Sequence, residues 1–196
     1  MKKILLGSLL LSSAIFADTI LYKNFEYGSF LNPTYEKAKP EETSLFPVKE
    51  KAGLEYYKAP TGEYLLYKSK KLVAVNVSKT TNDSLKEVNE KAKQNVPDSK
   101  FLGGNVLKLS KTKGALGRFS YKTEKELLKA EEENRLKATD DSILVYTEAF
   151  KNPKKRVVII YAEEFKKEKS CKKCDFVNEE SPKYKSENSL IEIYTK

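Results

Sequence analysis

Short strand-like runs, separated by turn residues, fill most of the sequence from Leu54 to the C-terminus. Tight connections such as 59–62 and 151–155 join neighbouring runs, which is typical of strands that pair antiparallel. The runs at 143–150 and 156–162 have the strongest apolar pattern, so we expect them at the centre of the sheet. Strands are predicted at 54–58, 63–68, 72–78, 106–109, 116–121, 143–150, 156–162 and 190–194.

Two helices are predicted between these strands. Ser84 and Glu87 form a capping box at the start of a helix that ends before Pro97, and Thr123 and Glu126 form a second one. Gly103-Gly104 predicts a turn before the strand at 106–109. Strands interspersed with two helices indicate an α+β fold, a mainly antiparallel sheet with both helices on one face.

The first seventeen residues resemble no part of this pattern. Residues 1–17 combine two lysines with a short apolar run and end in small residues, as a cleaved secretory signal peptide does. Small residues at Ala14 and Ala17 place the cleavage between Ala17 and Asp18. The apolar run is too short to span a bilayer, and no second one follows, so we expect no transmembrane segment in the mature chain. The predicted location is periplasmic or secreted, in a bacterium.

The mature chain divides by composition. Residues 18–50 contain three prolines and no sustained period, which predicts an irregular N-terminal arm. Residues 51–196 are expected to form a single α+β domain. Within that domain, a charged stretch at about 166–187 predicts a long loop.

The chain is basic, and lysine carries almost all of the positive charge. Lys and Arg number 37 against 28 Asp and Glu, a net charge of +9, and arginine occurs only at Arg118, Arg135 and Arg156. Lysine lacks the planar fork with which arginine binds phosphate and guanine. Because an exported protein rarely meets nucleic acid, we expect an envelope protein or an anionic envelope polymer as partner, and not nucleic acid.

Histidine is absent, which removes the commonest general base and the commonest metal ligand. Adjacent acids occur at Asp140-Asp141, Glu163-Glu164 and Glu179-Glu180, but neighbours on a strand point to opposite faces and do not form a catalytic pair. The sequence therefore identifies no catalytic, cofactor-binding or metal-binding residue and implies no cofactor. A non-enzymatic role is favoured.

Cys171 and Cys174 form one CxxC motif within the charged stretch. In an exported protein this pair is expected to close as a disulfide that clips a loop. The two lysines between the cysteines also fit a redox-active pair, because they stabilise thiolate. We expect an exported, non-enzymatic binding or envelope-associated protein; the alternatives are a thiol-disulfide redox protein that uses Cys171 and Cys174, and a secreted effector.

Overall fold

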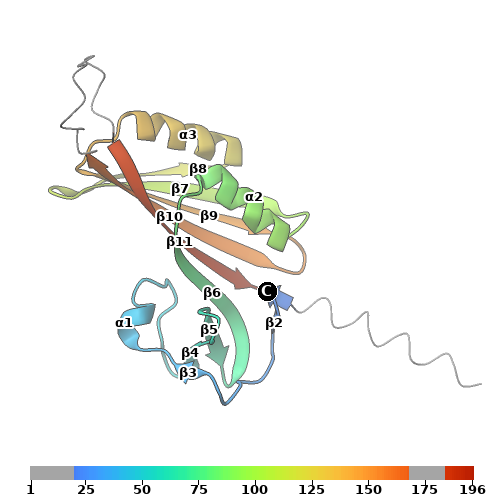
Figure 1. Cartoon of the computed structure of the whole chain (residues 1–196). Coiled ribbons are helices and arrows are strands. Elements are labelled where there is room, and N and C mark those ends of the chain that lie inside the picture. The colour runs from blue at the N-terminus through green and yellow to red at the C-terminus, as the bar shows by residue number, and fades with distance from the viewer. Residues whose placement is uncertain (1–19, 168–183) are drawn as a thin grey trace, which may run out of the picture. The chain divides into compact units, whose positions relative to one another are not determined.

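The computed structural model describes residues 20–167 and 184–196 of the chain (Figure 1). Contacts divide these residues into two compact units, which are described one at a time. The first unit contains residues 20–76 with the short pieces 153–156 and 193–196, and the rest forms the second unit. Three strands contribute residues to both units: β6 (Lys71–Thr81), β10 (Arg156–Lys167) and β11 (Tyr184–Thr195).

An antiparallel meander forms the sheet of the first unit. β4 (Leu54–Lys58), β5 (Tyr64–Lys68) and the first part of β6 pair in chain order. The amide of Gly62 donates to the carbonyl of Ala59 over 2.9 Å in the β4–β5 turn, and its φ of +95° is one that glycine adopts without strain. The meander predicted from the sequence is therefore confirmed.

The region expected as an irregular arm contains only short elements. These are β1 (Ile20–Tyr22), β2 (Phe25–Glu26), β3 (Glu36–Lys37), which pairs with β4, and α1 (Pro40–Thr43). Their connections nevertheless bury apolar side chains. The ring of Phe46 is 1 % exposed and lies 5.3 Å from the ring of Tyr56 and 5.2 Å from that of Tyr64. The arm thus supplies part of the core of the first unit.

The second unit is a sheet with the strand order β6-β11-β10-β9-β7-β8. β7 (Lys100–Ser110) pairs antiparallel with both β8 (Gly114–Tyr121) and β9 (Ser142–Lys151). β9 and β10 lie in the middle of this order, as the sequence predicts for 143–150 and 156–162. The expected α+β class, with a mainly antiparallel sheet, is confirmed.

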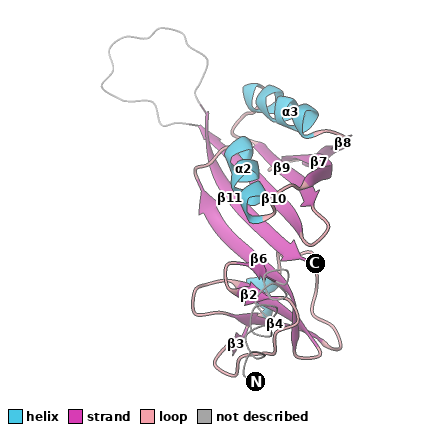
Figure 2. Ribbon diagram, turned by 90° about the vertical axis from the view of Figure 1, so that its right-hand side faces the viewer, coloured by secondary structure: helices cyan, strands magenta, loops and turns pink. Residues whose placement is uncertain are grey.

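Helices α2 (Leu85–Asn95) and α3 (Glu124–Leu136) cover one face of this sheet (Figure 2). Both begin as predicted. The hydroxyl of Ser84 accepts from the amide of Glu87, and the hydroxyl of Thr123 accepts from the amide of Glu126, each over 3.3 Å. Both glutamates bond back to the cap residue, so each capping box is complete.

Gly103 and Gly104 lie inside β7, so the predicted turn is wrong. Gly103 has a φ of +134° beside an irregularity in the pairing of β7 with β9. Gly104 faces α3, where a Cβ atom would lie 2.7 Å from Cδ2 of Leu127. Gly103 lies at a bulge against β9 and Gly104 at a close contact with α3, and both of these partner elements are distant in sequence.

The predicted loop at 166–187 overlaps both neighbouring strands, because β10 continues to Lys167 and β11 begins at Tyr184. The remainder of that stretch, with Cys171 and Cys174, lies outside the described residues. Residues 1–17, the predicted signal peptide, and the predicted cleavage site between Ala17 and Asp18 also lie outside them. Within residues 20–167 and 184–196, no helix has the length and apolar character needed to cross a membrane.

Candidate functional site

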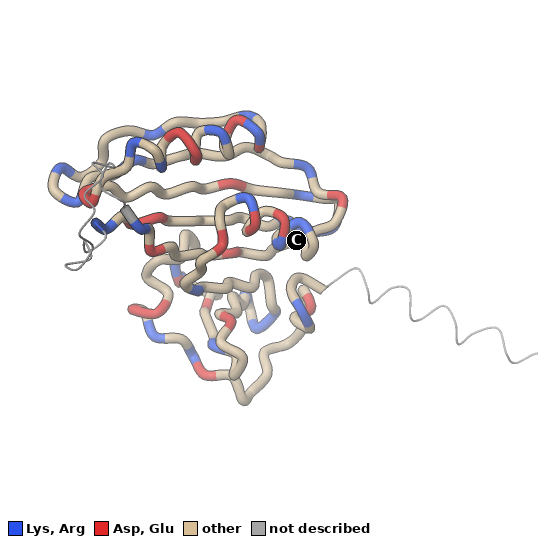
Figure 3. The backbone as a smooth tube through the Cα atoms, turned by 45° about the horizontal axis from the view of Figure 1, so that its top comes forward, with Lys and Arg blue, Asp and Glu red and all other residues tan. Residues whose placement is uncertain are grey.

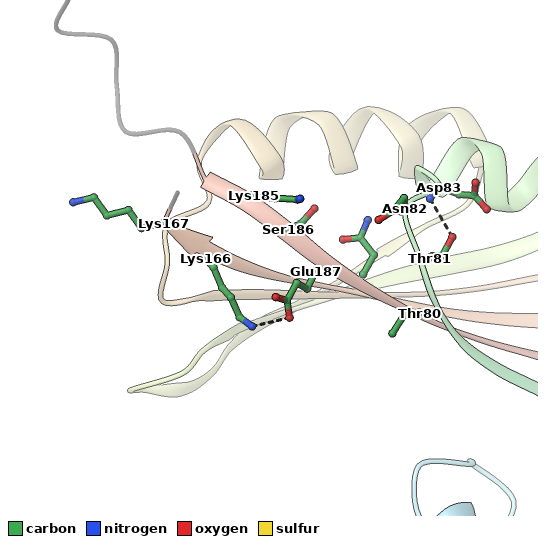
Figure 4. A pocket seen from close by; sticks show the side chains of 10 residues that line it. Thr80, Thr81, Asn82, Asp83, Lys166, Lys167, Lys185, Ser186 and Glu187 are labelled. Carbon is green, nitrogen blue, oxygen red and sulfur yellow. Dashed lines mark hydrogen bonds and ion pairs between the residues drawn. The ribbon is translucent and has the colours of Figure 1, made fainter. Parts of the chain in front are cut away.

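A groove of about 750 Å³ lies in the second unit, along the neighbouring strands β6, β11 and β10 (Figure 4). The end of β6 and the residue that follows it contribute hydroxyl and amide groups from Thr80, Thr81 and Asn82. The start of β11 adds the hydroxyl of Ser186. These neutral groups donate or accept hydrogen bonds, so the groove offers polar contacts along its length.

Three lysines line the groove, and its two acids are both paired. Nζ of Lys166 lies 2.6 Å from Oε2 of Glu187 (Figure 4), and Nζ of Lys91 lies 2.7 Å from Oδ2 of Asp83. These contacts lower the pKa values of Glu187 and Asp83 below their ordinary values. The other two lysines, Lys167 and Lys185, make no ion pair within the described part of the chain. The groove is therefore locally positive.

The excess of positive charge in the groove is a distinct feature, because positive and negative charges are mixed elsewhere in the described chain. Basic and acidic residues are interspersed along the described chain (Figure 3). Examples are the ion pair Lys129–Glu133 on α3 and the pair between Lys111, in the turn after β7, and Glu164 on β10. Mixed charge of this kind keeps a surface soluble without directing it to one partner. The groove is a more specific feature than the net charge.

Beside the groove, a buried tyrosine holds the segment that follows β6. The hydroxyl of Tyr161 on β10 donates to the carbonyl of Asp83 over 3.0 Å, and it accepts from Nδ2 of Asn188 over 2.7 Å. Tyr161 is fully buried. Since Asp83 and Asn188 both line the groove, these hydrogen bonds tie its two walls to the core.

A charge cluster of two buried acids and an arginine whose side chain is 43 % exposed lies between α3 and the sheet. Arg135 on α3 lies 3.3 Å from the carboxylate of Glu163 on β10 and 3.2 Å from that of Glu131. Burial raises the pKa of Glu163 to about 7, although the Arg135 guanidinium favours the ionised form. Burial also raises the pKa of Glu131 and that of the neighbouring Tyr146. A raised carboxyl pKa is typical of acid–base sites, but Glu163 is fully buried and does not line the groove.

A second buried acid, Glu148 on β9, lies under α2. Its Oε2 accepts from Nδ2 of Asn89 over 3.0 Å, and the same amide lies 3.3 Å from Glu124 on α3. Lys93 pairs with Glu124 at 2.6 Å. Burial raises the pKa of Glu148 to about 8, so this carboxyl holds its proton at neutral pH.

The sequence missed Glu148 and Glu163 as buried groups. Glu163 follows the fully buried Val157, Ile159 and Tyr161 at every second position along β10, and this period places it on the same face, toward the core. The strand alternation of Glu163-Glu164 is as expected, because Glu164 lies on the other face and reaches Lys111 at 3.1 Å. Among the described residues, no three acidic, cysteine or histidine side chains come together as metal ligands do.

The fold and the groove define an α+β protein with a positively charged polar groove. No protein-family model matches this chain, and neither curated proteins nor solved structures contain a match to it.

Proposed function

We propose that the protein acts outside the cytoplasm, in the bacterial envelope, as a non-enzymatic binding protein whose groove at β6, β10 and β11 holds an anionic envelope polymer. The observation that carries the proposal is the charge balance of the groove. Its two acids, Asp83 and Glu187, are neutralised by Lys91 and Lys166, while Lys167 and Lys185 are left to meet a ligand.

The remaining lining suits a hydroxyl-rich acidic polymer such as a polyuronate. Lysine ammonium groups attract carboxylates without demanding one geometry, which fits a repetitive ligand. Thr80, Thr81 and Ser186 can exchange hydrogen bonds with sugar hydroxyls. The strands that carry these side chains are held by the Tyr161 hydrogen bonds, which supports a preformed site.

The non-enzymatic character rests on the position of the perturbed acids. Glu148 and Glu163 have raised pKa values, yet both are at most 1 % exposed and neither lines the groove. A general acid or base must reach its substrate within hydrogen-bond distance. The pKa values of these two acids are therefore better explained by burial than by catalysis.

Binding of a lipid-free polyuronate to the full exported chain, measured by titration calorimetry, tests the proposal. We expect the double variant Lys167→Glu/Lys185→Glu to weaken binding by about tenfold or more, and added salt to weaken the binding of the unaltered protein. The matched control is Lys137→Glu/Lys151→Glu, which makes the same charge change at exposed positions outside the groove. Equal losses of affinity in both variants would show only an effect of net charge and would refute binding in the groove.

Two further measurements test the identity of the ligand and the location of the protein. Neutral dextran should not bind; binding of dextran as tight as that of polyuronate contradicts the charge argument. If the protein binds only vesicles of phosphatidylglycerol, the ligand of the groove is a membrane surface and not a polymer. Mass spectrometry of the exported chain should show Asp18 as its first residue, and retention of the full chain in the cytoplasm contradicts an envelope role.

The redox and effector alternatives remain predictions. Cys171 and Cys174, on which the redox alternative depends, lie outside the described residues.

A further inference from the structure

Strand β8 lies at one end of the sheet order in the second unit. It pairs with β7 from Gly104↔Tyr121 to Ser110↔Gly114, and no described strand pairs with its other side. The outer edge of β8 therefore presents backbone amide and carbonyl groups without strand partners. Such an edge is a template on which another extended chain can pair.

The composition of β8 leaves this edge unprotected. Natural sheet edges are usually guarded by lysines, prolines or inward-pointing charges. β8 contains no lysine and no proline, and Arg118 is its one charged residue, in a chain of which 33 % is charged. Instead it exposes Leu116 (61 %) and Phe119 (47 %). The edge is thus unusually apolar for this protein.

A second groove, of about 490 Å³, lies between β8 and α3. Ser120 and Tyr121 form its strand side, and Lys129, Ala130 and Glu133 lie on its helix side. Tyr121 pairs with Gly104, the residue that faces α3, so this groove lies on the helix-covered face. A chain added to β8 would direct every second side chain to that face, toward the groove.

The ring of Phe119 lies on the same helix-covered face, two residues before Tyr121 along β8. It lies over Gly117, where a Cβ atom would be 3.1 Å from the ring, and Nζ of Lys108 lies 5.0 Å from its centroid. Gly117 thus makes room for an exposed aromatic ring beside the free edge. An apolar side chain of an added strand would pack against this ring.

We propose that the outer edge of β8 takes up an extended segment of a partner polypeptide, with apolar side chains at every second position, by strand addition. Backbone hydrogen bonds to β8 would hold the segment, and Phe119 and the groove beside α3 would select its side chains. This interaction goes beyond the polymer groove, which lies along β6, β10 and β11.

A second copy of the chain fits this edge less well. Helix α3 contacts both β7 and β8. Because strands lie about 4.8 Å apart, joining two β8 edges would set two α3 helices about 10 Å apart. Glu126, Lys129 and Glu133 of both copies would then lose their hydration between the helices. A lone extended segment brings no helix and leaves these charges in water.

Hydrogen exchange of the full chain, followed by NMR, tests the proposal with synthetic peptides in which threonine alternates with valine, leucine or phenylalanine. At least one peptide should protect β8 amides from exchange before those of any other strand. The same peptide with alternate backbone amides methylated cannot pair along one edge, and we expect it to give no protection. Equal protection by the methylated peptide would refute strand addition.

Two double variants distinguish binding at the β8 edge from non-specific hydrophobic binding. Leu116→Lys/Phe119→Lys should weaken peptide binding by about tenfold. The matched control, Leu102→Lys/Leu136→Lys, replaces other exposed leucines and should bind normally. Absence of β8 protection by every peptide at millimolar concentration overturns the proposal. A dimer in sedimentation equilibrium that only the Leu116→Lys/Phe119→Lys variant abolishes would also overturn it, in favour of a second copy.

Discussion

Asn89 on α2 donates a hydrogen bond from Nδ2 to Oε2 of Glu148 on β9, 3.0 Å away, and both side chains are at most 1 % exposed. The other carboxyl oxygen, Oε1, has no hydrogen-bond partner among the described residues. Lys93 favours the ionised carboxylate and Glu124 opposes it, but burial dominates and raises the pKa to about 8. The pair therefore places a neutral, proton-holding acid between α2 and the sheet.

This acid makes the stability of the protein depend on pH. The ordinary pKa of a glutamate in an unfolded chain is about 4.3, so between about pH 4.5 and pH 8 the folded state holds a proton that the unfolded state has released. The free energy of unfolding must then fall as the pH rises through this window. Glu163, with a pKa raised to about 7, adds to the same slope.

Glu148→Gln should flatten this slope, because glutamine accepts from Asn89 without ionising. Above about pH 8 we expect the variant to be more stable than the unaltered protein, by on the order of 2 kcal/mol. Urea unfolding at a series of pH values measures the difference. The control is Glu90→Gln at an exposed position on the same helix, which should leave the slope unchanged. A slope that is equal in the Glu148→Gln variant and the unaltered protein would show that Glu148 is ionised in the folded state.

Arg135→Met should destabilise the protein by about 2 kcal/mol near pH 8, because it leaves Glu163 and Glu131 without their cation. The loss should shrink near pH 5, where both carboxyls can take up protons. Adding Glu163→Gln should recover part of the stability. Thermal unfolding at both pH values measures these effects, with Arg156→Met at an exposed site as control. A loss that does not change with pH contradicts a charge effect.

Gly104→Ala should destabilise the second unit by about 1–3 kcal/mol, since the new Cβ would lie 2.7 Å from Leu127 and 3.3 Å from Cβ of Glu148. Leu127→Ala alone should also destabilise, through the cavity it leaves. The double variant should lose less stability than the sum of the losses in the two single variants, because the smaller side chain at position 127 removes the clash. Strict additivity in urea unfolding would mean that the strand and helix do not meet at this point.

Cys171→Ser should change the thermal unfolding temperature little, because the ring that a CxxC disulfide closes is short and restrains the unfolded chain only slightly. Unfolding curves with and without reductant give the same comparison on the unaltered protein. As a loop clip, the disulfide should also resist glutathione. Rapid exchange with glutathione, together with a Cys171 thiol pKa below the usual value of about 8.5, would favour the redox alternative.

Some features of the fold were predictable because their signals are local. The capping boxes at Ser84 and Thr123 satisfy backbone amides three residues away, and the structure contains both. The apolar runs in β9 and β10 indicated central strands because strands in the middle of a sheet are covered most completely. The groove at Lys166, Lys185 and Thr80 had no such signal, since its residues lie far apart in sequence.

By itself, the sequence determined the helix starts, the meander of the first unit and the central position of two strands, because each depends on residues within a few positions of one another. The tertiary structure alone decided that Gly104 lies inside a strand under Leu127, and that Glu148 lies in the core under α2. It also decided that Lys167 and Lys185 share a groove in which both acids are already paired. These outcomes depend on which strands and helices pack together, and burial and ion pairing follow from that packing.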